Sequence, residues 1–411
     1  MKVLFLDAYF EPEQIAYTHM ERDLLAGLVE AGFDVEILCP LPTRGISPET
    51  AREYKHRREE LLFDGHVRVR RFRAPQEGTA VLLRALRYFW CNAQSFRLGR
   101  KVKNVDAVFA VSTPPTQGWI AGKVAKRLHV PFVYNLQDVF PDSLVNAGLT
   151  REGSPVWKLG RRIEDFTYRH AERIIVISEG FKRNLLAKGV PEDKLCVVSN
   201  WVDLDAVAPV ARAENPLFDE LGLSRSDFVV VYAGNLGEAQ GAEVIVEAAQ
   251  ELAPIEDLRF VLFGGGSKFE EIKKKAAPLK NILVTGLLPQ ERVPEVYSLG
   301  DAALITCRPG TGGAGLPSKT WSIMACNTPI IASFDTDSDL ADVLRESRAG
   351  WCVEPGDPHR LAEAILNARQ SRDEQKADIR GYAMATASRE ACVESYVAEL
   401  RNACRNGHKK S

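Results

Sequence analysis

The chain has 411 residues, of which 45% are apolar and 26% are charged. Because a single hydrophobic core stops growing at about 250–300 residues, we expect two domains of roughly 200 residues each. The net charge of -2 excludes a general attraction to nucleic acid, and no apolar run approaches the length of a membrane span.

The N-terminal half alternates short apolar runs with segments long enough to form helices. The first run, residues 2–6, is too short for a secretory leader, so we expect no leader sequence. It is followed by a polar loop and a predicted helix at residues 20–30. Further apolar runs lie at residues 34–39, 67–69, 107–111, 132–136, 174–178 and 196–198. This alternation predicts a parallel sheet with helices on both faces.

Residues 203–227 are less periodic and contain Pro209 and Pro216, so they are predicted to form a linker. A second series of apolar runs follows, at residues 228–232, 260–263, 282–285, 302–306 and 330–333. Glycine follows each of the first four runs. Since ligands of doubly wound sheets bind outside the carboxyl ends of the strands, these loops predict a phosphate-bearing ligand.

The loop after residues 302–306 is rich in glycine and leads to Ser318, Lys319 and Thr320. Ser318 is a good N-cap residue, which predicts a helix whose first N–H groups point outward at Lys319 and Thr320. Together with the Lys319 cation, these groups suit a phosphate. Taken alone, the stretch is equally compatible with an ordinary capped helix and a solvated lysine.

Basic residues are concentrated between His66 and Lys103, where ten Lys or Arg stand against one acid, Glu77. Residues 80–96 interleave apolar side chains with arginines. This pattern predicts an interfacial helix on an anionic membrane surface; the alternative is a basic helix whose apolar face lies in the core. We expect a cytoplasmic protein that is peripheral at the inner face of the plasma membrane.

Metal-binding patterns are absent from the sequence. The eight cysteines include no C-x-x-C pair, and the seven histidines show no ligand spacing. These features suit a reducing cytosol, and we expect no metal and no cofactor.

Six motifs carry a resemblance to a known family. In the C-terminal half they are Val231-Tyr-Ala-Gly-Asn-Leu-Gly-Glu-Ala-Gln-Gly241, Phe263-Gly-Gly-Gly266, Thr285-Gly-Leu-Leu-Pro289 and Leu316-Pro-Ser-Lys-Thr-Trp-Ser-Ile-Met-Ala325. In the N-terminal half they are Tyr134-Asn-Leu-Gln-Asp-Val-Phe-Pro-Asp142 and Asn200-Trp-Val-Asp203. They resemble the motifs of the family 4 glycosyltransferases, which have the GT-B fold.

The resemblance implies an α/β protein with two doubly wound, parallel-sheet (Rossmann-like) domains, an interdomain cleft and a C-terminal crossover helix. The expected divisions are an acceptor-side domain at 1–203, a nucleotide-sugar domain at 204–376 and a helix at 377–411 that packs back on the first domain. It also implies a retaining glycosyltransferase of capsule, colanic acid or O-antigen assembly, similar to fucosyl or L-fucosamine transferases. Such an enzyme moves a sugar from a nucleotide diphosphate sugar to a lipid-linked saccharide, which the predicted interfacial helix within residues 66–103 would reach. A UDP-sugar 2-epimerase and a non-catalytic sugar-nucleotide-binding subunit remain alternatives.

The resemblance also implies a donor site, from which this sequence departs. Asn235 and Gln240 stand where the family has the Arg and Lys that hold the diphosphate, and Ala314 and Ser322 stand where it has two glutamates. Lys319 must therefore supply most of the positive charge and is the predicted catalytic group on the leaving diphosphate. The predicted donor-binding residues are Gly234, Asn235, Gly237, Gln240, Gly264, Gly265, Gly286, Leu287, Arg308, Ser318 and Ser322.

Gln137 and Asp138 match the position after the fifth N-terminal strand at which the family has a group under the donor sugar. The family's histidine bonds a sugar 6-hydroxyl, whereas Gln137 can turn toward the backbone and leave room for a methyl group. This predicts a 6-deoxy donor, UDP-N-acetylfucosamine. Asp138 is expected to orient its loop or contact the acceptor; the alternative is that it caps a turn before Pro141.

The loop after the first strand supplies the predicted acceptor contacts. In this fold that loop faces the cleft, so Glu13, Tyr17 and His19 are candidates. A solvated loop is the alternative.

Overall fold

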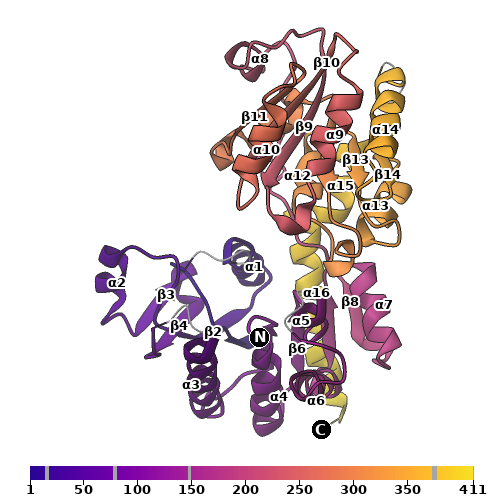
Figure 1. Cartoon of the computed structure of the whole chain (residues 1–411). Coiled ribbons are helices and arrows are strands. Elements are labelled where there is room, and N and C mark those ends of the chain that lie inside the picture. Colours follow the sequence, from indigo (N-terminus) through magenta and orange to yellow (C-terminus); the bar gives the residue numbers. More distant parts are fainter. Residues whose placement is uncertain (14–17, 77–80, 147–149, 373–376, 411) are drawn as a thin grey trace. The chain divides into compact units, whose positions relative to one another are not determined.

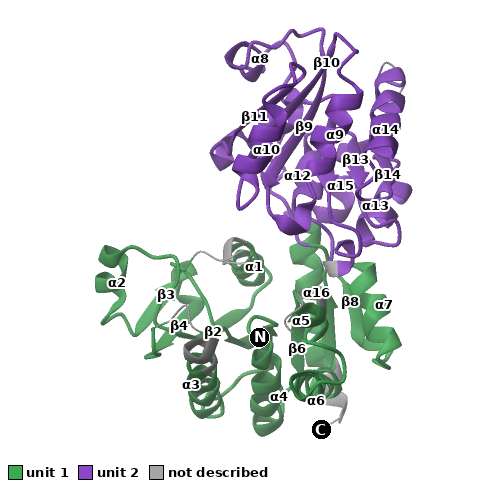
Figure 2. Ribbon diagram, viewed as in Figure 1, with its two compact units in different colours: residues 1–199, 390–411 green, residues 200–389 purple. Residues whose placement is uncertain are grey.

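The computed structural model describes the chain apart from residues 14–17, 77–80, 147–149, 373–376 and 411 (Figure 1). The chain forms two compact units. Unit 1 comprises residues 1–199 and 390–411, and unit 2 comprises residues 200–389 (Figure 2). Each unit contains its own Rossmann-like sheet, which confirms the predicted fold class.

Unit 1 is built on a sheet with the strand order β3-β4-β2-β1-β5-β6-β7-β8. β3 runs antiparallel to β4, and the other neighbouring strands are parallel. The strands are β1 (Lys2–Leu6), β2 (Asp34–Pro40), β3 (Glu59–Leu62), β4 (Val67–Phe72), β5 (Ala107–Val111), β6 (Phe132–Leu136), β7 (Arg173–Val176) and β8 (Leu195–Val197). The helices are α1 (Thr18–Glu30), α2 (Pro48–Tyr54), α3 (Val81–Gly99), α4 (Thr116–Leu128), α5 (Asp142–Asn146), α6 (Pro155–His170), α7 (Glu179–Ala187) and α16 (Arg389–Lys410).

Unit 2 is built on a parallel sheet with the strand order β11-β10-β9-β12-β13-β14. The strands are β9 (Phe228–Asn235), β10 (Leu258–Gly265), β11 (Ile282–Gly286), β12 (Ala302–Thr306), β13 (Ile330–Ser333) and β14 (Gly350–Val353). The helices are α8 (Leu217–Glu220), α9 (Glu243–Glu251), α10 (Phe269–Ala276), α11 (Val293–Leu299), α12 (Lys319–Ala325), α13 (Asp339–Ser347), α14 (Pro358–Gln370) and α15 (Ile379–Ala387).

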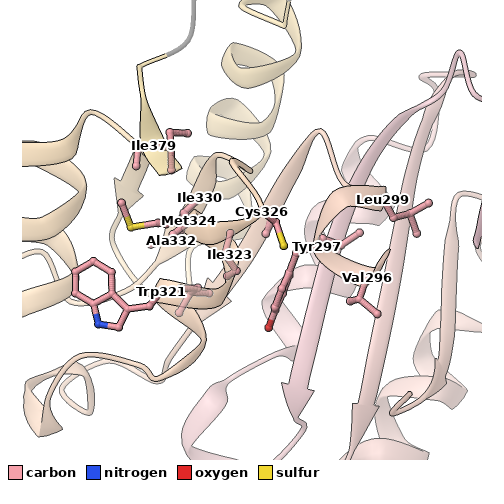
Figure 3. Packing of buried hydrophobic residues seen from close by; sticks show 14 of the residues in the cluster. Val296, Tyr297, Leu299, Trp321, Ile323, Met324, Cys326, Ile330, Ala332 and Ile379 are labelled. Carbon is pink, nitrogen blue, oxygen red and sulfur yellow. The ribbon is translucent and has the colours of Figure 1, made fainter. Parts of the chain in front are cut away.

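Helix α12 is fixed in unit 2 by the side chains that it buries. Trp321, Ile323 and Met324 lie in one hydrophobic cluster with Tyr297 of α11 and Ile330 of β13 (Figure 3). All five side chains are at most 5% exposed. Since burial of a large apolar side chain contributes about 1.5–3 kcal/mol, this packing sets the position of α12 and hence of Lys319 at its first turn.

Three features differ from the sequence prediction. β3 was not predicted, because its four residues are half-exposed and lack a long apolar run. The edge strand β14 was likewise too short to recognise. Residues 203–227 do not form a free linker: Leu217 and Phe218 are fully buried in unit 2, and Arg212 pairs with Asp301.

The C-terminal helix α16 packs within unit 1. Tyr396 is fully buried and meets the ring of Phe109 of β5 edge to face at 6.3 Å. Glu399 forms an ion pair with Arg173, at the start of β7. The preceding helix, α15, belongs to unit 2 and lies against α12.

Unit 1 also buries a pair of carboxyl groups. Asp7 follows β1 and hydrogen bonds to Glu21 of α1, and both are at most 4% exposed. Burial raises the pKa of Asp7 to about 7 and raises the pKa of Glu21 well above its usual range. The folded protein therefore binds protons here that the unfolded chain releases at lower pH. This contribution to stability is complete below pH ~4 and is lost as the pH rises through about 7.

Replacement of Asp7 by Asn should remove much of this pH dependence, because the amide keeps a hydrogen-bonding group opposite Glu21 without the second charge. We expect the free energy of unfolding to rise relative to wild type by roughly 2 kcal/mol near pH 8 and to change little near pH 5. Urea unfolding at the two pH values measures this. Glu30→Gln, a change at an exposed residue on the same helix as Glu21, is the control. An equal effect of D7N at both pH values would contradict the raised pKa of Asp7.

Candidate functional site

The sheet of unit 2 forks at its carboxyl end. β9 pairs with β10 through eight residues, from Phe228 to Asn235, whereas β9 and β12 pair only at Val230–Ala302 and Val231–Ala303. Consecutive strands run away from β9 in one direction and from β12 in the other, so this is the topological switch point of the sheet. A cavity of about 580 Å³ lies at the fork and is lined by the ends of both strands. Doubly wound folds bind their ligands at such a point.

The cavity brings together six of the residues predicted from the sequence. Gly234 and Asn235 are the last two residues of β9, Gln240 comes from the loop after β9, and Leu287 comes from the loop after β11. Ser318 and Lys319 come from the start of α12. The remaining lining is mainly apolar, with Phe263, Val296, Tyr297, Ile305 and Phe334 among its residues.

Lys319 supplies the cationic group of the cavity. Its Nζ lies 4.1 Å from the centre of the Tyr232 ring, which is fully buried. Within the described part of the chain, no carboxylate forms an ion pair with this ammonium. Burial lowers the pKa of Lys319 to about 8, because the charged form has lost water without gaining an anionic partner. An anion that entered the cavity would supply that partner.

Gly234 makes this position of Lys319 possible. Its φ is +142°, and a Cβ at this position would lie 2.9 Å from the Lys319 Nζ. Any side chain here would have to displace the ammonium. Glycine is therefore favoured at this position both by its backbone conformation and by the space that the ammonium occupies.

The two amide side chains that replace the family's cations bond to each other. The Gln240 Oε1 accepts from the Asn235 Nδ2 at 3.1 Å and from the Gly237 N–H at 3.2 Å. The Gly237 N–H, predicted to hold the diphosphate, is thus already engaged within its own loop. The physical reason is that a glutamine oxygen can reach back to this N–H, whereas a lysine in its place would have no acceptor to offer.

Ser318 does not cap α12 as the sequence predicted. Its backbone is helical, with φ -56° and ψ -30°, and its side chain makes no cap hydrogen bond. The Thr320 N–H donates to the Pro317 carbonyl at 3.0 Å, so it does not point outward. Pro317 starts a tight turn one residue earlier than the predicted cap, and this turn uses the N–H group that the prediction had left open.

The glycine-rich loop after β12 is held by Asp335, which follows β13. Its Oδ1 accepts from the Gly310 N–H at 2.9 Å and its Oδ2 accepts from the Gly312 N–H at 2.7 Å. Arg308, at the start of this loop, forms an ion pair with Glu238 at 2.5 Å. The Arg308 N–H donates to the Ala239 carbonyl at 2.9 Å, which joins the loops that follow β12 and β9.

The other predicted donor residues surround the cavity without lining it. Gly264 pairs in register with Gly234 on one side and with Gly286 on the other, so three glycines lie side by side at the strand ends. Gly265 pairs with Asn235. Ser322 is half-buried in α12, one turn after Lys319.

In unit 1, Gln137 and Asp138 directly follow β6 at the carboxyl end of the sheet. Both backbone N–H groups donate to the Ser112 hydroxyl, at 2.9 and 3.1 Å. The Gln137 Nε2 donates to the Asn135 Oδ1 at 2.9 Å, and the Asp138 Oδ2 accepts from the Ser143 hydroxyl at 3.0 Å.

Of the acceptor residues predicted in the first loop, Glu13 is buried. Glu13 is 1% exposed, and its Oε1 accepts from the N–H groups of Thr43 and Arg44 at 2.8 and 2.9 Å. Burial raises its pKa. It therefore holds the loop after β2, which the solvated-loop alternative did not foresee. Tyr17 and the side chain of His19 lie outside the described residues.

Helix α3 leaves part of its apolar face uncovered. Leu86, Phe89 and Trp90 are 58%, 72% and 46% exposed, at i, i+3 and i+4 on one side of the helix, so these three side chains do not enter the core.

The basic stretch is divided between internal pairs and surface charges. Arg68 and Arg70 of β4 pair with Glu59 and Glu36, and Arg71 and Arg87 are buried. Among the basic residues of this stretch whose side chains are described, the exposed ones are Arg68, Arg73, Arg97, Arg100, Lys101 and Lys103.

Three residues of the site were missed in the sequence. Tyr232 was treated only as part of an apolar strand, although its ring lies beneath Lys319. Asp335 and Thr306 are polar residues directly after or at the end of buried strands, and that position was the signal that could have identified them. In the described ranges, no group of His, Cys, Asp and Glu could hold a metal ion, and no helix is long and apolar enough to cross a membrane.

Two Rossmann-like units, one with a cation-bearing cavity at its switch point, define the GT-B class. Residues 18–201 match the model of the glycosyl transferase 4-like domain, and residues 227–371 match that of the glycosyl transferases group 1. WbjE of Pseudomonas aeruginosa, a probable glycosyltransferase, is 30% identical over 273 residues, which are 66% of this chain and 68% of WbjE. This chain belongs to the GT-B glycosyltransferases with 4-like and group 1 domains.

Other relatives agree with this family. WcaI of Escherichia coli (strain K12), named as a colanic acid biosynthesis glycosyl transferase, is 27% identical over 285 residues, which are 68% of this chain and 69% of WcaI. Among solved structures, sucrose-phosphate synthase from Thermosynechococcus elongatus has a TM-score of 0.71 at 16% identity, with 98% of each chain covered. HepE of Anabaena in complex with UDP has a TM-score of 0.70 at 15% identity, with 98% of this chain and 100% of HepE covered. These two structures share the fold.

The role of Asp335 predicts a local effect of its removal. In Asp335→Ala, the Gly310 and Gly312 N–H groups lose their acceptor, so we expect residues 308–315 to exchange amide hydrogen ~10-fold faster or more. Hydrogen-exchange mass spectrometry measures this. Thr336→Ala, a change at the next residue, which bonds only to Glu354 in the described structure, is the control. Unchanged exchange in D335A would show that other contacts hold the loop.

Proposed function

We propose that the protein transfers a sugar from a nucleotide diphosphate sugar, with retention of anomeric configuration, to a lipid-linked saccharide in the synthesis of a surface polysaccharide. The observation that carries the proposal is the Lys319 ammonium at a cavity on the switch point of unit 2, for which the described residues supply no partner carboxylate. Family membership supplies the reaction class. The relation to WcaI supports a role in polysaccharide synthesis, and the UDP held by HepE supports a UDP-linked donor.

The charge distribution supports a diphosphate in the cavity. Departure of a nucleoside diphosphate concentrates negative charge on the β-phosphate as the glycosidic bond breaks, and a half-buried ammonium at the cavity stabilises that charge. Because Asn235 and Gln240 are neutral and Arg308 is paired with Glu238, Lys319 carries this task in the free protein. Gln137 and Asp138 are the proposed sugar- and acceptor-side groups of unit 1.

For the donor sugar we propose UDP-N-acetylfucosamine. The Gln137 amide nitrogen donates to the Asn135 side chain, which supports a glutamine that turns away from a sugar hydroxyl. A pocket shaped for a methyl group rejects an added hydroxyl only modestly, so UDP-N-acetylglucosamine should also be used, ~10²-fold less well.

One experiment tests the function. The purified protein is incubated with each UDP-sugar, with and without a polyprenyl-diphosphate-linked saccharide, and both UDP and sugar identity are followed. Retaining transfer is supported if UDP release requires the acceptor and the sugar has the same anomeric configuration in the product as in the donor. Sugar isomerisation without acceptor indicates an epimerase, and binding without turnover indicates a non-catalytic subunit. A preference for UDP-N-acetylglucosamine would overturn the reading of Gln137.

Lys319 gives a prediction in two measurements. Lys319→Ala should lower kcat/KM by ~10²-fold or more. Burial lowers the pKa of Lys319 to about 8, and only the protonated lysine attracts the diphosphate. The affinity of wild type for UDP should therefore fall as the pH rises through 8, and it should be about tenfold weaker near pH 9 than near pH 7. Titration calorimetry checks this. Lys319→Arg stays protonated throughout, so its UDP affinity should not fall over this range; an equal fall would place the titration elsewhere.

We also propose that unit 1 binds an anionic membrane surface through α3, where the lipid-linked acceptor is found. Leu86, Phe89 and Trp90 offer apolar side chains that can enter the lipid interface. Exposed Arg97 lies on the same helix, and exposed Arg100 directly follows its last residue. Each basic residue near an acidic leaflet contributes ~1 kcal/mol, so several of them support reversible binding.

Flotation with phosphatidylglycerol-containing vesicles tests the surface. Wild type should float at low salt and much less at high salt, and Leu86→Ser with Phe89→Ser should abolish flotation, because the apolar insertion is lost. Trp90 is left unchanged because its Nε1 donates to the Arg73 carbonyl. Leu61→Ser, on the exposed edge strand β3, is the matched control and should float normally. If wild type stays with the soluble fraction at low salt, the membrane role of α3 is excluded.

A further inference from the structure

A buried hydroxyl lies at the end of the central strand of unit 2. Thr306, the last residue of β12, is 5% exposed and lines the cavity that also holds Lys319. Its Oγ1 has no hydrogen-bond partner in the part of the chain that the structure describes. Neighbouring strands do not use it: Thr306 pairs with Ser333 of β13 through the backbone, and β9 has already diverged from β12 at this level.

An unpaired buried hydroxyl costs stability, and valine, which has nearly the same shape, would not carry that cost. The hydroxyl gains a partner if a ligand oxygen enters the fork. In threonine a rotation of about 120° about χ1 moves Oγ1 to another of the three staggered positions on Cβ, so the hydroxyl can change direction without any movement of the strand.

We propose that Thr306 is a further binding residue for the donor, and that its hydroxyl donates a hydrogen bond to a phosphate oxygen of the nucleoside diphosphate. This inference rests on the proposed function. The chemistry favours a phosphate because Lys319, which lines the same cavity, is a cation, whereas two other polar residues of the lining, Asn235 and Gln240, are neutral and bonded to each other. A hydroxyl donor adds a bond to the anion without adding a second buried charge.

The chain offers a matched control one residue after Lys319. Thr320 is fully buried and its Oγ1 is likewise without a partner in the described structure, but it does not line the cavity. Valine at either position removes one unpaired hydroxyl from the interior. Both variants should therefore melt at a higher temperature than wild type, whereas only Thr306→Val should affect the ligand.

The experiment measures binding of UDP and of uridine by calorimetry to wild type, Thr306→Val, Thr306→Ser and Thr320→Val. We expect Thr306→Val to bind UDP about tenfold more weakly and uridine as wild type does, since a bond to a charged acceptor is lost only with UDP. Thr306→Ser should retain the affinity for UDP, and Thr320→Val should bind both ligands normally.

Other outcomes overturn the inference in distinct ways. Unchanged UDP affinity in Thr306→Val would mean that the hydroxyl does not meet the phosphate. An equal loss for UDP and uridine would assign the hydroxyl to the nucleoside or to the shape of the cavity. If Thr306→Val does not fold, the same comparison with Thr306→Ala against Thr306→Ser decides between these results. Failure of wild type itself to bind UDP would refute the proposed function and not the role of this residue.

Discussion

The position of Lys319 depends on an absent side chain. Its ammonium lies over the Tyr232 ring and passes residue 234 at a distance that no Cβ would permit. Gly234 satisfies two requirements: the backbone near the end of β9 has a positive φ, and the ammonium must reach the fork in the sheet. Because the hydrophobic packing of α12 fixes the other end of the lysine, the cavity, its charge and its lowered pKa all follow from one glycine and one buried helix.

The site achieves a positive character with very little charge. Asn235 and Gln240 bond to each other, and Arg308 is neutralised by Glu238. Their hydrogen bonds and the Asp335 carboxylate hold the two loops in place while contributing no net cation at the cavity wall. The consequence is a site whose electrostatics rest on a single ammonium and whose remaining donors are backbone and hydroxyl groups. In the proposed complex, the Coulomb attraction to a diphosphate would therefore come from this one ammonium, and hydrogen bonds from the other donors would position the anion.

The sequence predicted the two parallel sheets because helices cover both faces of such a sheet, so its strands are apolar along their whole length. Apolar runs that alternate with helical segments fit few other folds. The sequence also located the fork, since glycines after strands gather at the carboxyl ends of the sheet. The finer predictions depended on hydrogen bonds that pattern alone does not determine. Ser318 has the composition of a cap but helical backbone angles, and Glu13 has the composition of a surface acid but a buried carboxylate. The exposure of Leu86 and Phe89 was equally undetermined, because an amphipathic helix has the same periodicity whether its apolar face meets a core or a membrane.

The fork at β9 and β12 divides unit 2 into two groups of consecutive strands, β9 to β11 and β12 to β14, joined in the sheet by two residue pairs. This boundary has fewer paired residues than any other in the sheet, and the packing of α9 on α14 also joins the two groups. A ligand that contacts the ends of both strands spans it like a clamp, and its binding free energy is added to the cohesion of the sheet. A ligand that binds only when the two groups of strands are together therefore raises the free energy needed to separate them.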